Sequence, residues 1–232
     1  MKPPYYRILL LGSPGVGKGT IGRLLAQRLN ISHFVMGDII REHVQHETRF
    51  GKLAAHYINS GNIVPNKRVV KQFFIITKRN KKYSRGIVLD GFPRNLQQAS
   101  LLEKKGWHPC IVIYLSATTR TLIKRLGYRR ICPKCKRVYN LRTKQPHHDM
   151  RCDDDNTPLI LRSDDKPDVI KHRLDIYNKN TKPLIDYYQS RKILIRASTE
   201  HTPTQVLASI LPKLTKQLMQ KNCSITTWRK NK

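Results

Sequence analysis

The feature that most constrains the fold is the glycine-rich stretch GSPGVGKGT at residues 12–20. It matches a phosphate-binding loop, in which backbone N–H groups surround phosphate oxygens and a lysine, here Lys18, neutralises them. The preceding YYRILLLG is rich in strand-forming residues, and the following TIGRLLAQRLN has apolar residues at helical spacing. A loop between a strand and a helix is the context that phosphate binding requires, so phosphate binding is favoured over a chance glycine turn.

One position departs from the usual loop. The residue after Lys18 is Gly19, where a Ser or Thr normally helps to hold Mg²⁺, and Thr20 follows it. An acid must then share the metal, and Asp90 at the end of the apolar stretch GIVLDG is the candidate. A purely structural carboxylate there would need a buried partner such as a lysine or a helix N-terminus. We favour the alternative, in which Asp90 orients Mg²⁺ through water.

The rest of the chain repeats the pattern of strand, loop and helix. The stretches GIVLDG, CIVIYL and KILIRAS are further short, buried strand candidates, and such alternation predicts a parallel sheet flanked by helices. The region 131–161 breaks the pattern because it is rich in Cys, Lys, His, Pro and Asp, and we expect a small inserted domain there. The apolar runs are too short to span a bilayer, and no secretory signal pattern stands at the N-terminus.

The charge of the chain is its most unusual bulk property. Lys and Arg number 45 against 15 acidic residues, which gives a formal net charge of +30. Such an excess fits polyanionic surroundings, either nucleic acid or an anionic membrane. It equally fits a solvated basic surface in a matrix-type compartment. Charge alone does not decide between these interpretations.

Three stretches together resemble the adenylate kinase family of nucleoside monophosphate kinases: GSPGVGKGT, LDGFPRNLQQ and VMGDIIREHV. The resemblance extends over about residues 5–212. It implies an α/β fold of the P-loop NTPase type, with a parallel five-stranded sheet flanked by helices. It also divides the chain into a core at 1–130 and 162–212, a helical acceptor-binding segment at 35–64 within that core, a zinc-binding lid at 131–161 and a basic C-terminal tail at 213–232.

The resemblance also implies roles for single residues. Those expected at the donor nucleotide are Gly15, Val16, Gly17, Lys18, Gly19, Thr20 and Arg125. Those expected at the acceptor AMP are Met36, Arg41, Gly61, Val64, Gly91, Arg94 and Gln98. Those expected to serve the transfer itself are Lys18, Arg94, Arg129, Arg162 and Arg173, with Asp90 for the metal and with Asp164 and Asp165 as partners of the arginines. Met36 departs from the family, which usually has Thr or Ser there, so one polar contact to AMP is missing.

A metal site is predicted inside the lid. Cys132 and Cys135 form one pair three residues apart, and Cys152 and Asp155 form another after an interval of sixteen residues. Two such pairs suit the opposite sides of a tetrahedral ion, and long-lid members of the family bind zinc with this spacing, the last ligand being Cys or Asp. His147, His148, Asp153 or Asp154 could replace Asp155 as the fourth ligand. The alternative to a metal site is a set of reduced surface thiols.

We therefore predict an adenylate kinase that transfers a phosphoryl group from Mg·ATP to AMP, giving two ADP. Two alternatives stay open: a GTP:AMP phosphotransferase, and a kinase-fold subunit of a ribonucleoprotein, such as a mitochondrial ribosome, that binds RNA through its basic surface and tail. The expected cofactors are Mg²⁺ with ATP and a structural Zn²⁺. Basicity and the long lid favour the mitochondrial matrix over the cytoplasm, and the family resemblance favours a monomer.

Overall fold

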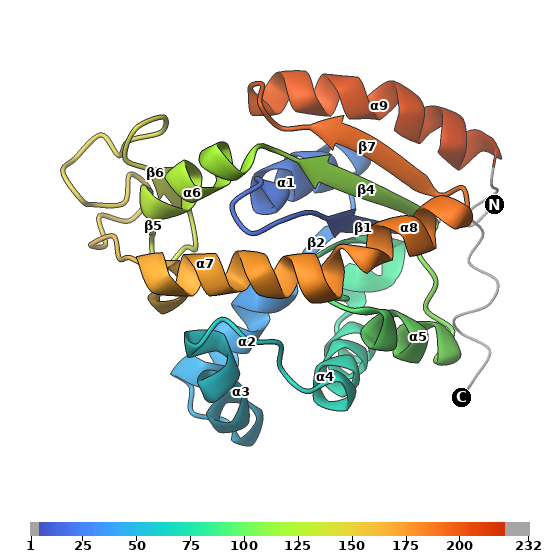
Figure 1. The fold of residues 1–232 in the computed structure, drawn as a ribbon, viewed down its shortest axis with the longest axis horizontal. Coiled ribbons are helices and arrows are strands. Elements are labelled where there is room, and N and C mark those ends of the chain that lie inside the picture. Colours follow the sequence, from blue (N-terminus) through green and yellow to red (C-terminus); the bar gives the residue numbers. More distant parts are fainter. Residues whose placement is uncertain (1–4, 221–232) are drawn as a thin grey trace.

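A five-stranded parallel sheet organises the computed structural model, which describes residues 5–220 of the chain (Figure 1). Its strand order is β2-β3-β1-β4-β7. The strands are β1 (Tyr6–Leu11), β2 (Ser32–Val35), β3 (Gly86–Asp90), β4 (Ile111–Ser116) and β7 (Leu194–Ser198). The prediction of a parallel five-stranded sheet flanked by helices is confirmed.

Helices cover both faces of the sheet, because its central strand buries side chains on either side. Leu9 and Leu11 of β1 pack with side chains of α4 and α5, whereas Ile8 and Leu10 pack with those of α1 and α9. The helices are α1 (Lys18–Leu29), α2 (Met36–Gln45), α3 (Arg49–Asn59), α4 (Asn66–Arg79), α5 (Leu96–Lys104), α6 (Thr119–Gly127), α7 (Pro167–Ile176), α8 (Pro183–Ser190) and α9 (Pro203–Gln220). Short turns add η1 (Lys81–Arg85), η2 (Ser163–Asp165) and η3 (Tyr177–Thr181).

A second, smaller sheet lies at one end of the molecule (Figure 1). It pairs β5 (Arg129–Ile131) with β6 (Val138–Asn140) in antiparallel fashion. Its buried side chains form a separate cluster of Cys132, Tyr139, Cys152 and Leu159. A core this small gives little hydrophobic stabilisation, so the unit needs another source of order.

The carboxyl ends of the parallel strands lead directly into the segments that the sequence singles out. The glycine loop follows β1, α2 follows β2, and Gly91 follows β3. The loop approaches its neighbour closely: a Cβ on Gly12 would lie 2.5 Å from the carbonyl oxygen of Leu115. Only glycine fits there, which is why the chain can turn sharply at the edge where parallel sheets place their ligands.

The structure differs from the sequence expectations at β2 and at the C-terminal tail. The strand β2 was absent from our strand candidates, because four residues with a single fully buried side chain, Phe34, give almost no alternating pattern. The predicted tail at 213–232 continues α9 as far as Gln220, and its remainder, with Cys223 and Trp228, lies outside the described residues.

Within residues 5–220, no helix has both the length and the apolar character needed to cross a membrane.

Candidate functional site

Lys18 stands at the start of α1, inside the turn of the glycine loop. Gly17 caps the helix with φ 97°, a backbone conformation that glycine adopts without strain. The Lys18 ammonium donates to the carbonyl oxygens of Gly12 at 2.7 Å and Ser13 at 2.9 Å. The loop therefore holds a cation beside the positive end of a helix, an arrangement that attracts phosphate.

Burial lowers the pKa of Lys18 to about 8, although the nearby Asp90 carboxylate opposes this shift. The positive charges of Arg94, Arg173 and Arg129 also contribute to this lowered pKa. Cations from three distant parts of the chain therefore surround the lysine, and an anion placed among them would restore its ordinary affinity for the proton.

The remaining residues predicted at the donor lie around the loop. Gly15, Val16 and Gly17 belong to the loop itself, while Gly19 and Thr20 are exposed in the first turn of α1. A Cβ on Gly19 would lie 3.8 Å from a carboxylate oxygen of Asp90, so this turn and the end of β3 are adjacent. Thr20 and Asp90 thus come from neighbouring segments and offer the oxygen ligands that Mg²⁺ prefers.

Arg125 of α6 reaches the same region from the other side. Its guanidinium donates to the Thr199 carbonyl oxygen at 2.6 Å and to the Thr199 hydroxyl at 3.0 Å, and it lies 3.5 Å from the Val16 carbonyl oxygen. Sequence reasoning missed Thr199. Its place directly after β7, at the carboxyl edge of the sheet, is the signal that points to it.

A pocket of about 480 Å³, including space open to solvent, lies between α2, α3, α4 and the end of β3. All seven residues predicted at the acceptor line it: Met36, Arg41, Gly61, Val64, Gly91, Arg94 and Gln98. Apolar walls come from Ile40, Ile58, Val69 and Phe92, and charged groups from Asp164 and Arg173.

The Gln98 side chain is held in this pocket by its neighbours. It is 1% exposed, its amide nitrogen donates to the Asn66 side chain at 2.9 Å, and its amide oxygen accepts from the Arg94 backbone at 2.7 Å. Asn95 also donates to the Asn66 side chain, at 3.0 Å. This network fixes the amide at the wall of the pocket, where a flat, polar ligand group could meet it.

Arginines converge on the boundary between the loop and the pocket. Arg129 binds Asp165 through two N–H groups, at 2.7 Å and 2.5 Å, and Arg173 donates to Asp165 at 2.9 Å. The Asp165 side chain is fully buried. Desolvation of the Arg94 guanidinium and, next, the positive charge of Arg173 lower its pKa to about 10. One buried carboxylate thus holds two cations together beside a third.

A second set of ion pairs continues this cluster towards α2. Asp38 lies 2.5 Å from Arg41 and 3.6 Å from Arg162. Asp164 lies 3.2 Å from Arg173 and 3.9 Å from Arg41. Burial alone would raise the pKa of Asp164, but Arg173 and Arg41 hold it below its ordinary value. The acids are therefore ionised and keep the arginines in place.

Some buried polar atoms of the site lack a partner among the described residues. They include Nε of Arg162 and Oδ1 of Asp164. Unpaired buried polar atoms are costly, so such atoms commonly mark places that a ligand or water completes. Sequence reasoning also missed His33, whose Nε2 lies 3.5 Å from Asp90. It comes from the overlooked strand β2, and the strand pairing places it beside β3.

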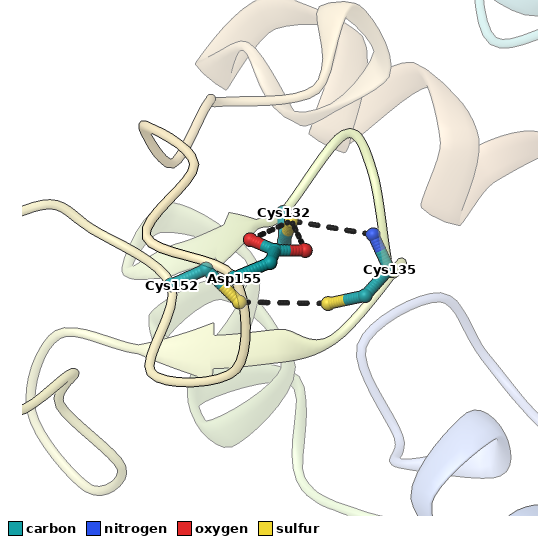
Figure 2. Close-up of side chains that lie close together, drawn as sticks. All are labelled: Cys132, Cys135, Cys152 and Asp155. Atoms are coloured by element: carbon teal, nitrogen blue, oxygen red, sulfur yellow. Dashed lines mark hydrogen bonds between the residues drawn. The ribbon is translucent and has the colours of Figure 1, made fainter.

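The four residues predicted as metal ligands meet in the loops beside the small sheet (Figure 2). One ligand atom from each of Cys132, Cys135, Cys152 and Asp155 lies within 4.8 Å of all the others. The Cys135 and Cys152 sulfurs are 3.5 Å apart, and the Cys132 sulfur is 3.4 Å from either oxygen of Asp155. For metal–sulfur bonds of about 2.3 Å, tetrahedral geometry requires sulfurs that are close in this way, so the set fits a zinc ion.

Three of the alternative fourth ligands, His147, Asp153 and Asp154, have other partners. Asp153 accepts from the His147 backbone at 2.8 Å and lies 3.6 Å from Arg137. Asp154 pairs with the same Arg137. Among the candidates, Asp155 alone belongs to the group of converging ligand atoms found in residues 5–220.

Comparisons with known proteins find relatives over most of the chain. A family profile described as "Adenylate kinase" matches residues 10–193. A protein named adenylate kinase from Mesomycoplasma hyopneumoniae (strain 232) is 35% identical over 204 residues, which cover 88% of this chain and 96% of the relative. One of the same name from Kosmotoga olearia is 41% identical over 194 residues, covering 81% and 89%. A third, from Caldanaerobacter subterraneus subsp. tengcongensis, is 38% identical over 208 residues, covering 88% and 94%.

The Asp165 geometry leads to a stability prediction. Asp165→Asn removes the buried charge between Arg129 and Arg173, so we expect the free energy of unfolding to fall by about 3 kcal/mol. Urea unfolding followed by circular dichroism measures this loss. The matched control is Asp168→Asn, which removes an exposed carboxylate of α7 and should change little. Equal stability of the two variants would contradict a structural role of the Asp165 carboxylate.

Proposed function

The chain belongs to the adenylate kinase family, and from this premise we propose how its residues share the work of the reaction. The protein is a nucleoside monophosphate kinase that transfers a phosphoryl group from Mg·ATP to AMP and yields two ADP. The family match favours this activity over the GTP-dependent and purely structural alternatives. In our proposal the glycine loop holds the donor and the pocket beside α2 holds the acceptor.

One observation carries the proposal. Arg94 and Arg173 line the pocket and also lie close enough to Lys18 to lower its pKa. A phosphate in the pocket and a phosphate in the loop would therefore share the same cations. This is the geometry that phosphoryl transfer needs, since catalysis rests on positioning and on stabilising negative charge, with little covalent work for the protein.

On the donor side, Lys18 and the backbone N–H groups of residues 15–20 contact the phosphates, and Arg125 lies beside the base. Thr20 and Asp90 would hold the Mg²⁺ that accompanies ATP, because a hydroxyl and a carboxylate from adjacent segments suit this ion. When bound, that ion neutralises charge on the phosphates. On the acceptor side, Arg41 and Arg94 grip the AMP phosphate, while Gln98, Gly61 and Val64 contact the adenine.

Between the two nucleotides, Arg129, Arg162 and Arg173 stabilise the charge that spreads over the transferred group. Transfer is direct and in line, with no covalent intermediate on the protein. Closure of the small sheet over the donor and of residues 35–64 over the acceptor would exclude water, so that AMP is phosphorylated in preference to water. A coupled assay of ADP formation tests the activity itself, with turnover expected on the order of 1–100 per second.

We further propose that zinc occupies the Cys132, Cys135, Cys152 and Asp155 cluster. With every position filled by a protein ligand, the ion has a structural role and stabilises a unit that has a very small core of its own. The predicted matrix location and monomeric state remain predictions, supported by the basic composition and by the family resemblance.

The arginine assignment predicts the effect of Arg94→Ala. We expect kcat to fall by at least about 100-fold, because a buried cation aimed at developing charge is lost. The control, Arg120→Ala, removes an exposed arginine of α6. Circular dichroism and thermal unfolding establish that both variants are folded. Wild-type turnover by folded Arg94→Ala protein would contradict the role that we assign to Arg94.

The acceptor pocket predicts a gain of affinity on changing Met36. This side chain is 1% exposed and lines the pocket, where it offers no hydroxyl to a ligand. Met36→Thr supplies one, so KM for AMP should fall roughly threefold to tenfold while kcat changes little, as one added hydrogen bond allows. Met36→Leu keeps the pocket apolar and should leave KM unchanged. If KM for AMP is no lower with Thr than with Leu, Met36 does not face the acceptor.

The zinc proposal is tested through its fourth ligand. The purified protein should contain one zinc per chain, and Cys152→Ser or Asp155→Ala should lose it together with thermal stability. Asp155→Cys should retain zinc, because a thiolate is an equally good ligand. Asp154→Ala is the matched control, since that carboxylate pairs with Arg137. Mass spectrometry of the intact variants measures their zinc content. Loss of zinc from Asp154→Ala, with zinc retained by Asp155→Ala, would refute our choice of Asp155 as the fourth ligand.

A further inference from the structure

A strongly basic surface runs along α4 and η1, away from the site described above. No Asp or Glu occurs between Glu47 and Asp90. The exposed cations of this stretch that lie on α4 and η1 are Lys67, Arg68, Lys71, Lys78, Arg79, Lys81, Lys82 and Arg85. We refer to them as the α4–η1 surface. None of them lines the acceptor pocket.

The cations of α4 point in similar directions. At about 100° per residue, Lys67, Lys71 and Lys78 lie within roughly 40° of one another around the helix axis. Arg68 and Arg79 extend this sector to roughly 120°. The opposite side of α4 is buried against the core through Val69, Val70, Phe73, Phe74 and Thr77. The helix therefore presents a stripe of positive charge about 18 Å long.

The η1 turn continues the stripe and is fixed to the sheet. Asn80 joins the two elements, and its side chain accepts from the Lys82 backbone at 3.0 Å. The Ser32 hydroxyl donates to the Lys82 carbonyl oxygen at 2.7 Å, which ties η1 to β2. Tyr83 is buried, with its ring 5.3 Å from that of Phe34. The cations are thus mounted on a rigid frame.

Acids do not neutralise this charge within the described part of the chain. Across residues 5–220, none of the eight side chains forms an ion pair with a carboxylate, whereas the site arginines Arg41, Arg129 and Arg173 all do. Like charges this close repel one another and weaken the folded state, unless an external anion compensates them. A charge arrangement of this kind therefore points to a polyanionic partner.

We propose that the α4–η1 surface binds a nucleic-acid duplex through its phosphate backbone. A duplex carries one negative charge per roughly 1.7 Å of its axis, so a stripe about 18 Å long faces several phosphates. The aromatic residues of α4 and η1 (Phe73, Phe74 and Tyr83) are all buried, so bases cannot stack on this surface. Contact is with phosphates, and binding is independent of base sequence.

A membrane is the less suitable partner. Amphipathic helices bind bilayers by inserting an apolar face among the lipids. The apolar face of α4 is already occupied by the protein core. A lipid surface would therefore meet charge alone, whereas a duplex matches both the charge and the linear shape of the stripe. This role goes beyond the kinase activity and can coexist with it.

The test compares two full-length variants that lose the same four positive charges. One carries Lys71→Gln, Lys78→Gln, Arg79→Gln and Lys82→Gln on the α4–η1 surface. The control carries Arg120→Gln, Lys124→Gln, Lys213→Gln and Lys216→Gln on exposed positions of α6 and α9. In Figure 1, α9 and α4 lie on opposite sides of the sheet. Circular dichroism and ADP formation show that both proteins are folded and active.

Fluorescence anisotropy with labelled RNA and DNA duplexes of about 20 base pairs, over a range of salt concentrations, measures binding. We expect the surface variant to bind at least about tenfold more weakly than the wild type, with a salt dependence lower by about four released ions. The control should retain most of the affinity. Binding of either duplex supports the proposal, and the tighter one identifies the partner.

Three results would overturn the proposal. One is equal weakening in both variants, which would mean diffuse attraction to net charge. Another is no duplex binding by the wild-type protein near 0.15 M salt. The third is a wild-type protein that binds no duplex but binds vesicles of anionic phospholipid, together with a surface variant that has lost this vesicle binding. That result would assign the surface to a membrane. Because ADP formation is measured separately, failure here leaves the kinase assignment untouched.

Discussion

Concentration of positive charge at the carboxyl edge of one sheet is the constraint on which this structure depends. Burial lowers the pKa values of Lys18, Arg94 and Arg173. The positive charges of Arg94 and Arg173 lower the pKa of Lys18 as well, and the charge of Arg173 lowers that of Arg94. Such a cluster stays together only because the buried carboxylates of Asp164 and Asp165 compensate part of it. The compensation is incomplete, and the remaining positive charge is what an incoming pair of phosphorylated nucleotides satisfies.

The scaffold serves this cluster by fixing the ends of its strands. Alternating side chains of β1 anchor the sheet in two cores, so the glycine loop and the segment after β3 start from rigid positions. In the small sheet the core is very small, and the zinc ion that we propose for the four converging ligand atoms would supply order instead. The strand ends therefore define the site, and Met36, Ile40 and Val64 of residues 35–64 pack in one of these cores.

Much of this arrangement could be predicted from sequence, because the decisive segments are local. Local spacing alone reveals the glycine loop between strand and helix. It also reveals the acid at the end of an apolar strand and the paired ligands three residues apart. The features that could not be predicted depend on how the strands pair in the folded protein. The strand β2 is short, and His33 reaches Asp90 because β2 pairs with β3. Thr199 follows β7, which is placed by its pairing with β4. Likewise, five acidic or His side chains compete as the fourth metal ligand in sequence, and the fold selects Asp155.

The positive charges of the chain are of two kinds, which salt screens to different degrees. The site arginines Arg129 and Arg173 are largely shielded from solvent and paired with buried acids, so salt screens them weakly. The cations of α4 and η1 are exposed and unpaired among the described residues, so salt screens them strongly. The reaction needs the first kind only. A net charge of +30 therefore exceeds what catalysis explains, and part of the excess has a defined place, on α4 and η1, whose apolar side chains already belong to the core.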